Sequence, residues 1–225
     1  MQFKTLTLKE AISYHLSLLS QIDDNTIVFS SLVFVLRDAR EITGRNLENG
    51  EHIISPPHGR LDSWLGALGY LTILDQIGKC YRPKLKSNIP KTNSITKALK
   101  YFTRLNENEI NAIYALRCAF SHDYSLFNIG PKGEKDPLTH HFTVTGIGYD
   151  NLVELPKYAW DGKHDNKTFE NRTVINLIKL GDLVEGIYDT LTTYFTADEL
   201  IIDLPGGHME LKDRYLMFAY QHNGG

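Results

Sequence analysis

Three side chains that suit chemistry on a phosphate lie close together in the stretch ALRCAFSHDYSL, residues 115–126. They are Arg117, His122 and Tyr124. A guanidinium group binds phosphate oxygens through several N–H donors, and an imidazole exchanges a proton near neutral pH. One interpretation of the combination is a site that acts on phosphate. The alternative is ordinary helix decoration, with Arg117 in a salt bridge to Asp123 or a distant glutamate and His122 favoured as a cation near a helix C-terminus.

The spacing of Arg117 and His122 does not place them on one face of a single helix. Five residues correspond to about 140° around a regular α-helix. The two side chains therefore converge only if the helix distorts or ends near SHD, or if two copies of the helix meet across a dimer axis. Ser121, His122 and Asp123 are not a serine-hydrolase triad, because adjacent residues point in different directions. Ser121, Asp123 and Tyr124 remain candidate regulatory or substrate-contacting residues.

A run of positive charge precedes this stretch. From Lys79 to Arg104 the chain carries eight cations and neither aspartate nor glutamate, although its net charge is −3. Clustered cations attract a phosphate backbone without reading its sequence, and interleaved aromatic residues can stack on unpaired bases. The predicted RNA-binding residues are Lys79, Arg82, Lys84, Lys86, Lys97, Lys100 and Arg104. The alternative for such a run is a solvated loop and helix face.

The remaining histidines and cysteines indicate no metal site and no cofactor. His140 and His141 are adjacent and would point to opposite faces of a strand. Cys80 and Cys118 form no CxxC pair, and they fit a reducing compartment. No HExxH, phosphate-binding loop or dinucleotide fingerprint is present.

Composition and length favour one globular domain covering residues 1–225. The chain is 42% hydrophobic and 23% charged, which is ordinary for a soluble protein. Its N-terminus lacks the basic start and apolar run of a signal peptide, and its longest apolar run is too short to span a bilayer. We therefore expect a cytoplasmic protein without membrane association.

Helical periodicity dominates the chain and predicts a mainly α fold, a helical bundle with a small β-hairpin insertion. The spacing of Thr7 and Glu10, and of Asn106 and Glu109, is typical of helix N-caps. Trp64 belongs to the face of the third helix that we expect in the core. The predicted helices cover residues 7–19, 25–45, 60–81, 94–105, 106–128 and 173–195. The predicted hairpin lies at about residues 138–156, with a turn at 149–151, and the tail is ambiguous between strand and helix.

The stretch RCAFSHDY has the form Arg-x4-His-x-Tyr and resembles the signature of HEPN domains (higher eukaryotes and prokaryotes nucleotide-binding). The preceding LNENEINAIYAL and the following SL also resemble that family's motif helix, and the likeness covers roughly residues 60–126. HEPN domains are helical bundles that usually form dimers and bring two copies of the motif to one cleft. The resemblance therefore implies a homodimer.

The resemblance also implies a function. Many HEPN proteins are metal-independent endoribonucleases of toxin–antitoxin, phage-defence or RNA-processing systems. His122 would be the general acid and base, and Arg117 would stabilise the scissile phosphate of an RNA. Tyr124 matches the tyrosine that a partner nucleotidyltransferase modifies in a toxin subgroup, which implies an antitoxin partner. Cys118 departs from the polar residue that often follows the motif arginine, so a non-catalytic RNA- or nucleotide-binding module and a dimeric interaction scaffold stay open as alternatives.

Overall fold

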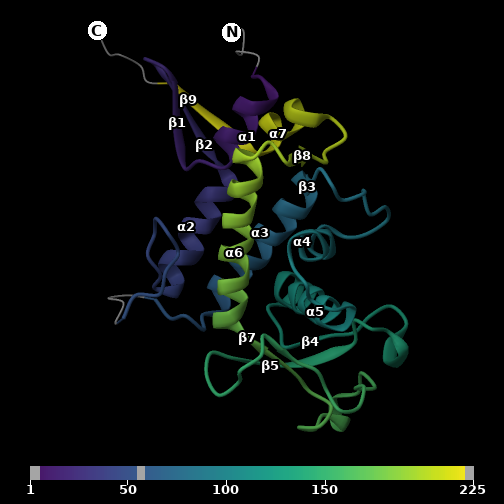
Figure 1. The fold of residues 1–225 in the computed structure, drawn as a ribbon. Coiled ribbons are helices and arrows are strands. Elements are labelled where there is room, and N and C mark those ends of the chain that lie inside the picture. The colour runs from purple at the N-terminus through teal and green to yellow at the C-terminus, as the bar shows by residue number, and fades with distance from the viewer. Residues whose placement is uncertain (1–5, 55–58, 221–225) are drawn as a thin grey trace.

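The computed structural model describes residues 6–54 and 59–220 (Figure 1). The helices are α1 (Leu8–His15), α2 (Ser31–Thr43), α3 (Trp64–Cys80), α4 (Ser94–Phe102), α5 (Glu107–Asp123), α6 (Leu177–Thr196) and α7 (Gly207–Tyr215). The strands are β1 (Leu19–Asp23), β2 (Thr26–Ser30), β3 (Tyr81–Pro83), β4 (Phe127–Asn128), β5 (His140–Thr145), β6 (Val153–Glu154), β7 (Thr173–Asn176), β8 (Leu200–Ile202) and β9 (Leu216–Tyr220). Short 3₁₀ turns lie at Gly133–Lys135 and His164–Asn166.

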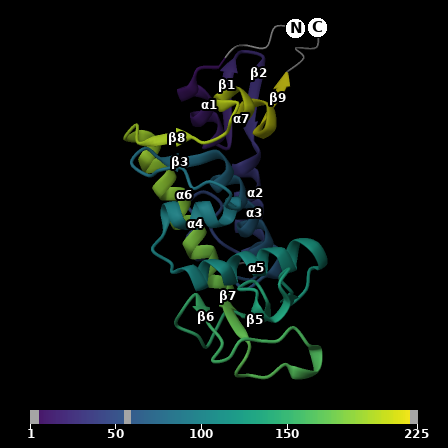
Figure 2. The same ribbon diagram turned by 90° about the vertical axis from the view of Figure 1, so that its right-hand side faces the viewer.

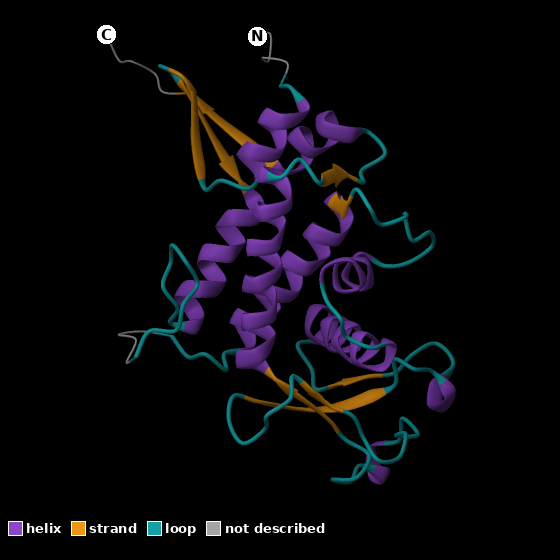
Figure 3. Ribbon diagram, viewed as in Figure 1, coloured by secondary structure: helices purple, strands orange, loops and turns teal. Residues whose placement is uncertain are grey.

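The fold is an α/β mixture, so the prediction of a mainly α helical bundle is wrong. The structure is 47% helical and 17% strand, and its strands form three sheets. Their orders are β1-β2-β9, β3-β8 and β4-β5-β7-β6. The three-stranded sheet and the four-stranded sheet lie at opposite ends of a layer of helices (Figure 3).

The predicted β-hairpin at about residues 138–156 is also wrong. β5 and β6 both occur in this segment, but β7 lies between them. β5 pairs with β7 in parallel, and β6 pairs with β7 antiparallel. The physical reason is burial, because all four residues of β7 are buried and such a strand takes a central place in a sheet. These residues were predicted to begin the helix over residues 173–195.

The predicted helix over residues 25–45 is a strand followed by a helix. Residues 26–30, TIVFS, alternate between buried and half-buried positions, and they pair with β1 on one side and β9 on the other. Ser30 then caps α2, since its hydroxyl group accepts a hydrogen bond from the backbone N–H of Val33. A short apolar run rich in β-branched residues fits a strand and a buried helix equally well by periodicity alone.

The central helix of the protein is α3, which packs against α2, α4 and α6 (Figure 1). Its inner face is mainly apolar and includes Leu71, Ile73, Leu74 and Ile77, all at 0% exposure. Gly78 lets α4 approach closely, because a Cβ there would overlap the carbonyl oxygen of Ser94. At the far end of this core, α5 covers the strands β4–β7 (Figure 2).

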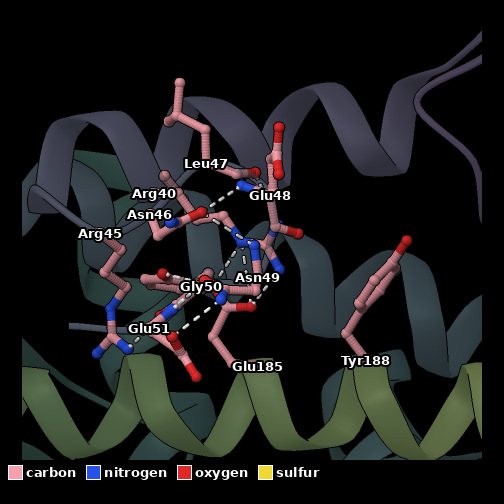
Figure 4. A network of polar contacts seen from close by, with 12 residues as sticks. Arg40, Arg45, Asn46, Leu47, Glu48, Asn49, Gly50, Glu51, Glu185 and Tyr188 are labelled. Carbon is pink, nitrogen blue, oxygen red and sulfur yellow. Dashed lines mark hydrogen bonds and ion pairs between the residues drawn. The ribbon is translucent and has the colours of Figure 1, made fainter. Parts of the chain in front are cut away.

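A buried ion pair joins α2 to α6 (Figure 4). Arg40 is 4% exposed, and its Nη2 lies 2.7 Å from Oε2 of Glu185. The same guanidinium group donates to the backbone carbonyls of Leu47 and Glu48, and the hydroxyl group of Tyr70 donates to Glu185. The pair therefore fixes the loop after α2 as well as the two helices.

A buried histidine makes the stability of the fold depend on pH. His15 is 0% exposed, its Nδ1 lies 2.6 Å from the hydroxyl oxygen of Tyr81, and its Nε2 lies 2.9 Å from the amide nitrogen of Gln76. The amide must donate to Nε2, so the neutral ring carries its proton on Nδ1. Burial lowers the pKa of His15 to about 3.

We therefore predict that acidification from pH 7 to pH 5 lowers the free energy of unfolding by about 2 kcal/mol through His15 alone. Below its ordinary pKa the unfolded chain binds a proton at His15 that the folded protein excludes, so the stability falls as the pH falls. Urea unfolding of wild type and His15→Gln across this range measures the contribution. An equally steep pH dependence in the variant would contradict the prediction.

Candidate functional site

The helix α5 carries the candidate residues on an unbroken scaffold. The side chain of Asn106 caps its start, as the sequence predicts. In return, the backbone N–H of Asn106 donates to the side chain of Glu109. The helix continues through Asp123, and Tyr124 ends it in the left-handed conformation, with φ 50° and ψ 44°. A regular helix over this range keeps Arg117 and His122 about 140° apart. The two side chains of one copy therefore point in different directions around α5, although the helix does end near SHD, at Asp123.

Arg117 is held by a carboxylate on the neighbouring helix α3. Its Nε and Nη2 each lie 2.7 Å from Oδ2 of Asp75. This partner is neither of those expected from the sequence. The side chains of Arg117 and Asp75 are 31% and 28% exposed, and no other described residue forms a side-chain hydrogen bond or ion pair with the guanidinium group. Donors on Nη1 thus remain for a ligand, while Asp75 fixes the orientation of the group.

The face of α5 around Arg117 also carries Tyr114 and Cys118. Partial burial raises the pKa of Tyr114, and the neighbouring Cys118 raises it further. Cys118 is a half-buried free thiol. Cys118 follows Arg117 directly in the chain, and it interacts with Tyr114, which lies about one helical turn earlier.

The side chain of His122 is open to solvent in the last turn of α5. Ser121, His122 and Asp123 are all exposed. None of these three side chains forms a hydrogen bond or ion pair with the described part of the chain. His122 is thus available to a ligand or a second protein chain, without a protein group to displace.

An aromatic cluster supports the end of α5. The ring of Trp64 stacks on Phe120 at 5.6 Å between centroids, and Tyr124 contacts Trp64 edge-on at 5.8 Å. Phe120 is buried, whereas Tyr124 is 46% exposed. Trp64, expected in the core, is half-buried and also lines an open cavity of about 640 Å³. Sequence reasoning did not find this role, because a tryptophan at helical spacing fits the core equally well.

Part of the basic run forms ion pairs with carboxylates from elsewhere in the chain. Asp203 pairs with both Arg82 and Lys97, at 2.9 Å and 3.1 Å. Asp198 pairs with Lys84 at 2.7 Å. These two aspartates follow α6, about a hundred residues later in the chain, so no local window of sequence reveals them.

The other predicted RNA-binding cations divide into two kinds. Lys100 pairs with Glu107 at 2.8 Å, and Lys86 donates to the backbone carbonyl of Lys100. Lys79 and Arg104 are exposed, and neither forms an ion pair with a described residue. The seven residues therefore do not form a continuous unpaired patch, because Arg82, Lys84, Lys97 and Lys100 have carboxylate partners.

His140 and His141 form hydrogen bonds with neighbouring segments of the chain. His140 hydrogen-bonds with Thr173 and with the carbonyl of Pro137, and His141 with Asn171. Within residues 6–54 and 59–220, no group of three or more histidine, cysteine, aspartate or glutamate residues is arranged to hold a metal ion. Over the same ranges, no helix combines the length and the apolar character needed to cross a membrane.

Comparison with known proteins gives no match: neither a family model, nor a curated protein, nor a solved structure is similar to this chain. The candidate residues lie on α5 and in its surroundings. They present one positioned guanidinium group, one free imidazole and an exposed tyrosine. Such a set can bind a phosphate and move a proton.

Proposed function

We propose that the protein is a metal-independent endoribonuclease whose site combines Arg117 of one copy with His122 of a second copy. The observation that carries the proposal is the free, exposed side chain of His122 on an unbroken helix that also presents Arg117. A dimer axis near the end of α5 would bring these groups of two copies together. The resemblance of residues 117–124 to the HEPN signature supports the same arrangement.

The reaction follows from the groups present. One His122 takes the proton from the ribose 2′-hydroxyl, whose oxygen then attacks the adjacent phosphorus. The bond from phosphorus to the 5′-oxygen breaks, and that oxygen takes a proton from water, to which His122 afterwards releases the proton that it gained. Arg117 stabilises the charge on the phosphate oxygens, and Asp75 holds its guanidinium group in place. The products are a 2′,3′-cyclic phosphate and a 5′-hydroxyl end.

The proposal extends to a partner and a location. The exposed residue Tyr124 suits a modifying antitoxin protein, because a transferase must reach the side chain that it modifies. We place the protein in the cytoplasm, where RNA is present and where Cys80 and Cys118 stay reduced. This arrangement would serve a toxin–antitoxin or phage-defence system.

A mixed dimer tests the composite site directly. We expect a dimer of one Arg117→Ala copy and one His122→Ala copy, purified through two different tags, to keep about half of the wild-type activity, because a two-fold dimer retains one intact pair. Each homodimeric variant should be inactive. An inactive mixed dimer would contradict the composite site, since it would mean that both residues act within one copy.

A further inference from the structure

The cavity beside Trp64 lies next to the candidate site. It is bounded by the end of α2, the loop before α3 and the strand β5, through Ile42, Arg60, Asp62, Ser63, Trp64 and Val144. Phe120 covers one face of the Trp64 ring, and Tyr124, two residues from His122, contacts its edge. A ligand in this cavity therefore lies close to the end of α5.

Backbone contacts fix the wall of the cavity before any ligand arrives. The N–H of Arg60 donates to the carbonyl of Ile42 at 3.0 Å, and the N–H of Ser63 donates to the carbonyl of Arg60 at 2.9 Å. Gly59 has φ +83°, and a Cβ there would lie 2.6 Å from the carbonyl oxygen of Ile42. Glycine suits this position, and the hydrogen bond from Arg60 to Ile42 holds the adjoining backbone against the end of α2.

The polar side of the cavity offers acceptors next to donors. Arg60 donates from Nε and Nη2 to the two oxygens of Asp62, at 3.0 Å and 2.9 Å. The side chains are 79% and 33% exposed. Each carboxylate oxygen keeps a lone pair for another donor, and the guanidinium group keeps three N–H donors. An aromatic ring, a pair of acceptors and a set of donors thus face one space.

Guanine matches this set better than the other bases. Its N1–H and N2 amino group donate along one edge, which suits a carboxylate, and its O6 and N7 accept along the adjacent edge, which suits a guanidinium group. Adenine presents the N1 acceptor where guanine presents a donor, so it would place a lone pair against Asp62. The π-face of any base can stack on Trp64, which adds affinity without selectivity.

We propose that the cavity formed by Arg60, Asp62, Ser63 and Trp64 binds an unpaired guanine base of the RNA that is cleaved at α5. The inference rests on the proposed ribonuclease function, to which it adds a base preference. The guanine stacks on Trp64 and hydrogen-bonds with Asp62 and Arg60. Cleavage therefore occurs at a phosphate near a guanine.

Fluorescence of Trp64 measures the binding without any cleavage. The second tryptophan, Trp160, is 1% exposed, and its replacement in Trp160→Phe leaves Trp64 as the only tryptophan. Titration with guanosine monophosphate should quench this emission at a concentration about tenfold lower than adenosine monophosphate requires, the ratio expected for one well-formed base contact. Asp62→Asn should remove the preference, whereas Glu210→Gln, which alters an ion pair on α7, should keep it. If Trp160→Phe fails to fold, the difference between wild type and Trp64→Phe supplies the same signal.

Equal quenching by the two nucleotides, or an unchanged preference in Asp62→Asn, would overturn the inference. Cleavage of RNA in a separate assay then tells the two proposals apart. Cleavage without guanine preference would leave the ribonuclease standing and the guanine site refuted. Selective guanine binding without cleavage of any RNA would support the guanine site and refute the ribonuclease.

Discussion

His122→Ala is expected to lower the rate of RNA cleavage by about 10²- to 10⁴-fold, the range for loss of a general acid–base group. Arg117→Ala is expected to lower it by about 10²- to 10³-fold, since it removes a donor to the charge that develops on the phosphate. His122 is exposed and makes no side-chain hydrogen bond or ion pair with the described residues, so its removal should leave the unfolding transition unchanged. The rate is measured with purified dimer and a labelled RNA.

Ser121→Ala is the matched control for this comparison. It lies one residue away on the same exposed turn and has no assigned proton transfer. It should keep the wild-type rate within about threefold, as expected for an exposed substitution away from the chemistry. A folded His122→Ala variant that still cleaves RNA at the wild-type rate would remove His122 from the mechanism.

Glu185→Ala is expected to lower the free energy of unfolding by about 3–5 kcal/mol, because it leaves the buried charge of Arg40 without a partner. It also removes the acceptor of the Tyr70 hydroxyl group. The Arg40–Glu185 pair is 4% and 10% exposed, so little solvent replaces the lost contact. Urea unfolding at pH 7 measures the change.

Two control variants distinguish the effect of an unpaired buried charge from the effect of losing an exposed ion pair. Arg214→Ala breaks the exposed pair with Glu210 on α7, and it should change the free energy of unfolding by less than about 1 kcal/mol. The double variant Arg40→Met/Glu185→Leu should be more stable than Glu185→Ala, because it removes both charges. A Glu185→Ala protein as stable as the Arg214→Ala protein would show that the pair adds nothing to the fold.

Local signals were sufficient to predict several elements of the fold. The capping boxes at Thr7–Glu10 and Asn106–Glu109 occur as predicted, because each depends on residues three apart in the chain. The helix predicted over residues 60–81 is α3, Trp64–Cys80. Its length and apolar face leave no competing interpretation.

Strands were predicted less well, because their stability comes from partners far away in the chain. β2 pairs with β9, nearly 190 residues later, so nothing within residues 25–45 separates the strand from the following helix. β7 is a central strand only because β5 and β6 flank it. Periodicity alone predicted one helix over residues 173–195, so it included the residues of β7 in that helix.

The candidate site shows the same division between local and distant information. The sequence offered Asp123 or a distant glutamate as the salt-bridge partner of Arg117, but it could not identify Asp75 on α3. It likewise described the basic run without Asp203, which forms ion pairs with two of its members. Residue types and spacing were therefore sufficient to select the candidate residues on α5. The tertiary fold determines which cations have a carboxylate partner.

The most direct test of the central claim is incubation of the purified wild-type protein with a set of varied single-stranded RNAs in EDTA. The account predicts cleavage without added metal, with 2′,3′-cyclic phosphate and 5′-hydroxyl ends on the products. Intact RNA at high protein concentration, or cleavage that EDTA abolishes, would contradict a metal-independent ribonuclease built on Arg117 and His122.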